Sequence, residues 1–269
     1  SGSTLKAGVH VALGNIHPKS QFIEKDLTVE DFLYSDRYNM HENTYGGFVE
    51  YIYKHKNTSV STGLRLEYTD YSARSQVDNK KYDYNRMDYF PFFSINQKVG
   101  SMADISLRLA SGIDRPHFLD YVPNYRYTSK YAYSVGNPDL KPSKFYSATL
   151  GSMFLDFLYL EFTYLHTKDI ISPISKNEEN SFQEVTTILN SSDENRFIFQ
   201  MNCPYIFLNN RLSGYLGAWI GYGKYTNLKV NLGEYYNAEY KGFYLTNQTQ
   251  YEIIDNLNVG YDLYYQPKL

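Results

Sequence analysis

The feature that most constrains this fold is an alternation of apolar and polar residues with a period of two, which recurs along most of the chain. In residues 59–70, Leu64 and Leu66 fall on one side of an extended backbone, and Arg65 and Glu67 fall on the other. Because successive side chains of a β-strand point to opposite faces, this pattern predicts strands with two different surfaces. About eleven such segments, each near the length of a tilted membrane strand, lie at 4–14, 44–55, 59–72, 88–97, 101–113, 143–154, 156–169, 196–207, 211–226, 240–253 and 257–267.

The connections between these segments alternate between short and long. Short connections lie near 56–58, 98–100, 154–156, 208–211 and 254–256, and long ones occupy 15–43, 73–87, 114–142, 170–195 and 227–239. Transmembrane β-barrels have short periplasmic turns and longer outer loops, whereas the Greek-key crossings of a soluble sandwich break such regularity. The sequence therefore predicts an all-β, up-and-down antiparallel transmembrane β-barrel with its long loops at one end. Because an odd number of strands does not close an antiparallel ring of the bacterial kind, we expect open edges.

Composition agrees with a membrane barrel but leaves a tyrosine-rich soluble β-protein or adhesin equally open. The 269 residues include 30 Tyr and 16 Phe, and tyrosine suits a strand with one apolar and one wet neighbour. The net charge of −3, without a basic run of interleaved aromatics, argues against a nucleic-acid partner. No stretch approaches the ~20 consecutive apolar residues of a membrane helix. Cys203 is the only cysteine and is expected to be a small apolar filler of its strand.

A proline-containing segment, Tyr-Ser-Val-Gly-Asn-Pro-Asp-Leu-Lys-Pro at 133–142, closes a wide loop. Pro138 and Pro142 fix φ and lack a backbone donor, so neither suits a central strand. Gly136-Asn137-Pro138 has the residue types of a turn. The segment is therefore expected to end the loop and to lead into a strand near Phe145.

Four segments together resemble the outer-membrane barrel of TonB-dependent receptors. Residues 136–142 are similar to the family's GNPxLKPE segment, 114–116 to its Arg-Pro pair, 63–69 to its GLRxExT strand, and 89–91 to its FP strand start. The four follow the family's order and cover roughly residues 45–170. Two positions depart from the pattern, because Ser143 stands where Glu is usual and Ser111-Gly112 stands where a basic pair is common.

The resemblance implies a plugged barrel of roughly 22 strands, of which residues 4–269 would form part of one barrel domain without its plug. Ser1-Gly2-Ser3 are expected to be a cloning remnant or a cut point. Leu269 is not the terminal aromatic residue usual in the family, so we expect a piece of a longer protein. The implied function is energy-coupled uptake of a bulky nutrient (siderophore, vitamin, glycan or peptide) across the cell outer membrane. The implied partners are outer-membrane lipid, the protein's own plug domain, a TonB-type energy coupler and, in some members, a surface lipoprotein.

Four charged residues are predicted to face the lumen or the plug, namely Arg65, Glu67, Arg108 and Glu161. In a plugged barrel such groups would hold the plug or line the substrate path. The alternative is a set of cross-strand ion pairs that only compensate one another's charge. Trp219 is expected to face the lumen, or an interfacial girdle if its register differs by one residue.

The predicted substrate-binding residues lie in the loop 114–142 and are Tyr121, Tyr125, Tyr127, Tyr131 and Tyr133. Rings on an outer loop can stack on sugars, flat macrocycles or peptide side chains, or they can pack the loop as its own small core. Because prolines stiffen the segment and rings on a mobile loop would expose apolar surface, we expect an ordered loop. Tyr127, Tyr131 and Tyr133 should then pack together or on a neighbouring strand. Asn137 and Asp139 should make local turn bonds.

No set of residues for catalysis or for a metal stands out. The histidines lack ligand spacing, and neither a Gly-x-Ser-x-Gly elbow nor a phosphate loop is present. We therefore expect neither a cofactor nor a metal, and we do not expect an enzyme. Acidic residues of the expected long loops are interpreted as solvated charge, with cation or sugar-hydroxyl contact as the alternative: Asp78, Asp83, Glu178, Glu179, Asp193 and Glu194.

The main alternative function is a soluble or cell-surface β-sheet module for binding or adhesion, and a passive porin is a third possibility. The apolar face separates the first two, since it would meet lipid in a barrel and a second layer of protein in a soluble module. In the barrel, eight residues should share one lipid-facing surface: Leu64, Leu66, Leu150, Leu158, Leu160, Phe162, Leu216 and Leu263.

Overall fold

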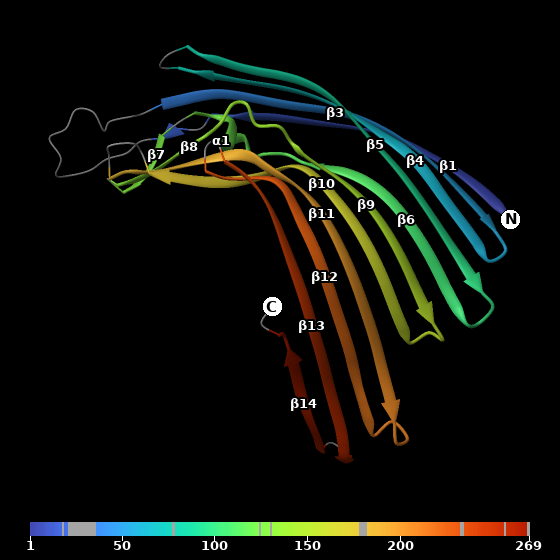
Figure 1. The fold of residues 1–269 in the computed structure, drawn as a ribbon. Coiled ribbons are helices and arrows are strands. Elements are labelled where there is room, and N and C mark those ends of the chain that lie inside the picture. Colours follow the sequence, from blue (N-terminus) through green and yellow to red (C-terminus); the bar gives the residue numbers. More distant parts are fainter. Residues whose placement is uncertain are drawn as a thin grey trace.

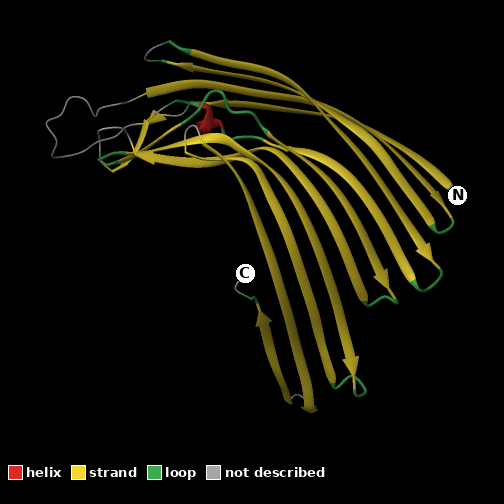
Figure 2. Ribbon diagram, viewed as in Figure 1, coloured by secondary structure: helices red, strands yellow, loops and turns green. Residues whose placement is uncertain are grey.

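The computed structural model describes residues 1–17, 19–20, 36–76, 79–123, 125–129, 131–177, 182–231, 234–255 and 257–267. Figure 1 shows one open, curved sheet, with β1 along one edge and β14 at the other. Strands account for nearly all of the regular structure, as Figure 2 shows. In the described part of the chain, no helix is long and apolar enough to cross a membrane.

The elements follow one another with few interruptions. They are β1 (Gly2–Ile16), β2 (Lys19–Ser20), β3 (Asp36–His55), β4 (Thr58–Ser75), β5 (Lys81–Val99), β6 (Ala103–Asp114), α1 (Phe118–Tyr121), β7 (Tyr125–Ser129), β8 (Ala132–Val135), β9 (Ser143–Phe154), β10 (Leu158–Asn177), β11 (Glu184–Phe207), β12 (Leu212–Asn231), β13 (Glu234–Ile254) and β14 (Leu257–Tyr265). The strand β1 already includes Gly2 and Ser3, which pair with Lys54 and Tyr53.

The main path of the sheet is β1-β3-β4-β5-β6-β9-β10-β11-β12-β13-β14. Each strand on this path is antiparallel to its neighbours. The predicted up-and-down topology is therefore confirmed. The short turns gather at one end, where Lys56, Gly100 and Asn209 adopt positive φ.

The expected lengths of several loops were wrong. The expected loops 73–87, 170–195 and 227–239 are mostly strand, because β4 with β5, β10 with β11, and β12 with β13 stay paired far beyond the expected ends. Crossing the bilayer sets only a minimum strand length of ~9–11 residues, and nothing prevents pairing from continuing in water. Asp193 and Glu194 consequently lie in β11 and not in a loop. Asp78, Glu178, Glu179, Leu269 and most of the expected loop 15–43 lie outside the described residues.

The pairing register divides the sheet into two chemically distinct faces. Leu150 lies opposite both Leu107 and Phe162, and Phe162 lies opposite Phe199. Following the pairs across the sheet places all eight predicted lipid-facing residues on this same face, which confirms that prediction. Many of them are exposed, as Leu66 is at 45%. We call this the apolar face and the opposite one the inner face.

A row of aromatic side chains crosses the apolar face away from the short turns. Tyr45 stacks on Tyr68 with ring centroids 6.5 Å apart. On the other half of the sheet, Phe197 lies 4.9 Å from Tyr164 and 6.4 Å from Tyr222. From this row to the short turns, roughly ten residues at ~3.3 Å each and a tilt of ~40° span about 25 Å, the height of the apolar band of an outer-membrane barrel. The strand segments beyond the row therefore project past a band of this height.

The buried core of the described residues lies in these projecting segments. It consists of Tyr38, Met40, Tyr71, Ala73, Tyr121, Val122 and Leu140, with Ile16, Tyr82, Tyr84, Ile171 and Ile188 packed against it. Tyr121, Val122 and Leu140 come from the connection between β6 and β9, and the others come from six strands, β1, β3, β4, β5, β10 and β11. The connection that the sequence marked as a wide loop is thus the element that fills the space between distant strands (Figure 1).

Candidate functional site

The connection 115–142 is an ordered unit that lies at the end of the sheet away from the short turns (Figure 1). His117 caps α1, since its Nδ1 accepts from Leu119 N at 3.4 Å and its own N–H donates to Asp120 Oδ2 at 3.1 Å. After α1 the chain forms the β7–β8 hairpin, and β8 pairs in parallel with the start of β11. The expectation of an ordered loop is therefore confirmed.

Tyrosine rings hold α1 against the projecting strands. The Tyr121 side chain is only 2% exposed, and its ring centroid lies 4.9 Å from that of Tyr71 and 5.4 Å from that of Tyr84. The hydroxyls of Tyr121 and Tyr84 share a hydrogen bond of 3.1 Å. Burial raises the pKa of the Tyr121 hydroxyl above its ordinary value, so this ring stays neutral across the physiological range. Tyr121 therefore packs α1 against β4 and β5.

The other predicted substrate-binding tyrosines lie on the β7–β8 hairpin. Tyr133 is buried, and the rings of Tyr125 and Tyr127 pack on it at centroid distances of 5.3 and 5.2 Å. The expected packing of Tyr127 on Tyr133 is confirmed. The side chain of Tyr131 is 55% exposed, while its carbonyl accepts from Glu184 N at 2.7 Å. Substrate contact by these rings stays a prediction.

The segment 136–142 fastens this unit to the other half of the sheet. The Asn137 side chain accepts from Asp139 N at 3.0 Å and donates to the carbonyl of Ile188 at 3.2 Å. The expected turn bond of Asn137 is thus confirmed, and Asp139 joins that turn through its backbone N–H. The Asn190 side chain completes the attachment by accepting from Lys141 N at 2.9 Å and donating to its carbonyl at 2.7 Å.

Gly136 is required where this segment crosses α1. A Cβ at this position would overlap the carbonyl oxygen of Val122 and crowd that of Asp120, and both are backbone atoms that cannot rotate away. We expect Gly136→Ala to detach the segment 136–142 and raise its protease susceptibility, because overpacking typically costs about 1–3 kcal/mol. Limited proteolysis of the folded full-length protein measures this. Gly2→Ala, where a Cβ meets no atom within 4 Å, is the control and should leave cleavage unchanged.

On the inner face, an ion-pair cluster joins three of the segments that the sequence singled out. Glu67, 6% exposed, accepts from Arg115 Nη2 at 2.6 Å and pairs with Arg65 Nε at 3.2 Å. Arg115 also donates to Thr69 Oγ1 at 3.4 Å, and Arg65 lies 4.7 Å above the Phe90 ring. Arg115 belongs to the Arg-Pro pair, whose role as the partner of Glu67 was missed because 48 residues separate them.

A second buried carboxylate, Asp88, lies beside this cluster. Asp88 lies directly opposite Glu67 in the pairing of β4 with β5, and it is 2% exposed. Arg86 Nε at 2.8 Å and Lys144 Nζ at 3.4 Å both approach Asp88 Oδ1. Asp88 Oδ2 is buried without a hydrogen-bond partner among the described residues. The charges of these two neighbouring carboxylates are thus compensated by four cationic side chains, those of Arg65, Arg86, Arg115 and Lys144.

Only two of the four residues predicted to face the lumen or plug come together. The register places Arg65, Glu67, Arg108 and Glu161 on the inner face, opposite the leucines. Arg65 and Glu67 form a pair within β4, and not the cross-strand pair that the alternative interpretation expected. Arg108 lies across from Thr149, whereas Glu161 accepts from Thr163 Oγ1 at 3.4 Å and from the Tyr159 hydroxyl. Contact with a plug stays a prediction for all four.

A second inner-face cluster, absent from the predicted site, lies on β11 to β13. Arg196 holds the buried Glu194 through both carboxylate oxygens, at 2.9 Å from Nη2 to each. The Tyr240 hydroxyl accepts from Arg196 Nε at 2.7 Å and donates to Glu194. The sequence signal was the two-residue spacing of Glu194 and Arg196, but it was hidden because Glu194 was assigned to a loop.

Trp219 forms the floor of a hollow beside that cluster. The register puts it on the inner face, opposite to Leu216, as predicted. Its indole occupies the space that a Cβ would need at Gly221 and at Gly242, so these glycines let the ring lie against the sheet. Arg196, Tyr225 and Tyr240 complete the lining of a hollow of about 550 Å³. In the described residues, no group of three or more His, Cys, Asp or Glu side chains could hold a metal ion.

With one apolar face, a charged inner face and short turns at one end, the geometry is that of an outer-membrane barrel wall, and the family comparison decides the assignment. Residues 1–268 match the family model described as outer membrane protein beta-barrel family. The chain belongs to this family. Membership of this outer-membrane β-barrel family places the protein in the cell outer membrane, so the apolar face is its lipid-facing surface. No curated protein matches the chain in sequence.

Solved structures of metal transporters share this barrel fold. The FrpB iron transporter from Neisseria meningitidis (F3-3 variant) is 13% identical, with a TM-score of 0.53 over 98% of this chain and 49% of its own. The copper transporter OprC is 14% identical, with a TM-score of 0.54 over 97% of this chain and 48% of its own. The F5-1 variant of FrpB gives 13% identity and a TM-score of 0.52 over 97% and 48%. The chain thus spans about half the length of these transporters.

Proposed function

We propose that this chain forms part of the wall of an outer-membrane receptor that takes up a bulky nutrient by energy coupling. The observation that supports this proposal most is the ordered connection 115–142, which is fixed to β3–β5 through Tyr121 and to β11 through Asn137. A receptor needs such a rigid surface to recognise its ligand before transport.

The shared fold with an iron and a copper transporter supports this proposal, as does the resemblance to TonB-dependent receptors. The substrate would be a siderophore, a vitamin, a glycan or a peptide. The partners would be a plug domain inside the barrel, a TonB-type energy coupler and, where the substrate requires capture, a surface lipoprotein. Chemistry on the substrate is not part of the proposal, because the buried charges form pairs with one another and not a nucleophile–base set.

The soluble binding module is the weaker candidate. Its apolar face would require a second layer, whereas the leucines of β4, β9 and β14 are exposed in this sheet. A passive porin differs from the proposed receptor in its dependence on energy. Uptake through a porin would persist after deletion of the energy coupler, whereas uptake through the proposed receptor would stop.

The recognition role of the hairpin is tested by a triple variant of the full-length protein. We expect Tyr125→Ala, Tyr127→Ala and Tyr131→Ala together to lower ligand binding about tenfold or more, because aromatic contacts in binding sites are worth ~1–3 kcal/mol each. A panel of a ferric siderophore, a cobalamin, an oligosaccharide and an oligopeptide first identifies the ligand that cells take up. Binding of that ligand is then measured at matched barrel abundance.

The matched control replaces two tyrosines near a short turn, Tyr51→Ala and Tyr53→Ala, which lie on the apolar face and outside the connection. This control should keep full binding. If the triple variant binds as tightly as the control, the hairpin tyrosines serve packing alone and recognition belongs to other surfaces.

A further inference from the structure

The apolar face has a notch where one side chain is missing from an otherwise filled row. The register aligns Val9, Gly47, Leu66 and Tyr89 across β1, β3, β4 and β5. Gly47 is the member without a side chain. The nearest atom to a Cβ at this position would be the Gly8 carbonyl oxygen at 3.8 Å, so the space above Gly47 is open.

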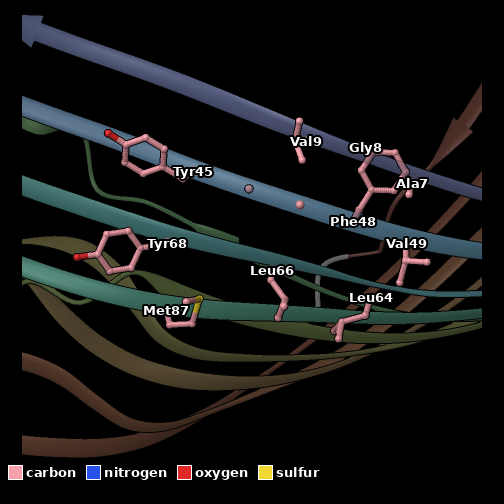
Figure 3. Close-up of a pocket in the computed structure, with 12 residues that line it drawn as sticks. Ala7, Gly8, Val9, Tyr45, Phe48, Val49, Leu64, Leu66, Tyr68 and Met87 are labelled. Atoms are coloured by element: carbon pink, nitrogen blue, oxygen red, sulfur yellow. The ribbon is translucent and has the colours of Figure 1, made fainter.

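The residues around Gly47 turn this gap into a groove with defined ends. Figure 3 shows Tyr45 and Tyr68 at one end and Val49 and Leu64 at the other, with Val9 and Leu66 on either side. The groove has a volume of about 740 Å³. The side chains around it are aliphatic groups, a thioether and three aromatic rings, and no charged residue lines it. Only an apolar ligand fits this chemistry.

The depth of the groove in the bilayer follows from its place on the strands. Tyr45 and Tyr68 belong to the aromatic row at the outer end of the apolar band, away from the short periplasmic turns. From Tyr68 to Leu64 the strand advances four residues, or about 13 Å at ~3.3 Å each. The groove therefore runs from the outer aromatic row towards the middle of the membrane, within the outer leaflet.

We propose that this groove is a binding site for one acyl chain of an outer-leaflet lipid. The site is independent of the nutrient path, since the groove opens on the lipid-facing surface and the charged clusters lie on the other face. An acyl chain in the notch would contact Leu66 and Val9 on both flanks and Tyr45 at its head. It would supply the van der Waals contacts that the side chains around the notch lack when the notch is empty. The row through Leu150, with Leu107 and Phe162 on either side, has no such gap.

Photocrosslinking in isolated outer membranes tests the site with the full-length protein. The photoreactive residue p-benzoylphenylalanine is placed at Met87, which lines the groove, or at Tyr222, which lies in the aromatic row of the same face but outside the groove. After irradiation, mass spectrometry identifies the adduct. We expect several-fold more lipid adduct at Met87 than at Tyr222, and we expect the lipid to be the glycolipid of the outer leaflet.

Filling the notch should abolish the excess of lipid adduct at Met87. Gly47→Leu in the Met87 probe background should lower the adduct to the level at Tyr222, because the new side chain occupies the gap without a backbone clash. Ala148→Leu adds similar bulk to the same face on β9 and should leave the Met87 adduct unchanged. Heat-modifiable migration on a gel confirms that both variants are folded barrels. Equal yields at the two probes, an excess that survives Gly47→Leu, or an adduct made only of periplasmic-leaflet phospholipid would each overturn the proposal.

Discussion

Replacing Tyr121 by Ala should release α1 from the projecting strands and expose the whole connection 115–142 to solvent. The ring is 2% exposed and contacts Tyr71 and Tyr84, so its removal leaves a cavity in the largest buried cluster of the described residues. Removal of a buried aromatic ring costs about 3–5 kcal/mol. Amide hydrogen exchange on the folded full-length protein would show this as lost protection around residues 117–122.

A second variant separates the contribution of the Tyr121 ring to stability from that of its hydroxyl. Tyr121→Phe keeps the packing and removes only the 3.1 Å hydrogen bond with the Tyr84 hydroxyl. It should cost about 1 kcal/mol, with most of the protection retained. If amide exchange at residues 117–122 were no faster in Tyr121→Ala than in Tyr121→Phe, packing of the Tyr121 ring would not be what orders the connection. The attachment through Asn137 would then be enough to order it.

Replacing Arg115 by Ala should destabilise the junction between β6 and the connection by about 2–3 kcal/mol. Removing one member of a buried pair leaves an uncompensated charge and costs about 3–5 kcal/mol. The effect here should be smaller because Glu67 keeps Arg65 at 3.2 Å and because the Arg115 side chain is 27% exposed. Local exchange at residues 113–116 and denaturant unfolding of the full-length barrel both report the loss.

A double-mutant cycle distinguishes the ion pair from general packing. In a Glu67→Gln background, Arg115→Ala should cost much less than in the native protein, since the charge that needs compensation is already gone. Lys98→Ala is the surface control, because Lys98 and Asp104 are 3.7 Å apart and both are exposed. That control should stay within about 0.5 kcal/mol of the native protein. Additive effects of the Glu67 and Arg115 replacements would argue against the coupling.

The sequence by itself determined the two faces and the topology. Side chains alternate strictly along a strand, so the spacing of Leu64, Arg65, Leu66 and Glu67 assigned each residue to a face without knowledge of its neighbours. The positions of the short turns then fixed which strands pair. The same local logic found the segment 136–142, because Gly and Pro restrict the backbone wherever they occur.

Tertiary structure alone decided which residues meet across strands. Arg115 reaches Glu67 over 48 residues, and Asn137 reaches Ile188 over 51, so neither contact leaves a periodic signal in the chain. Strand length could not be predicted from local sequence either. Membrane thickness sets the least number of residues in a strand, and cross-strand partners decide how far pairing continues. The notch at Gly47 exists for a related reason. A glycine becomes a groove only when the register places Val9 and Leu66 on either side of it, and register is a property of the paired sheet.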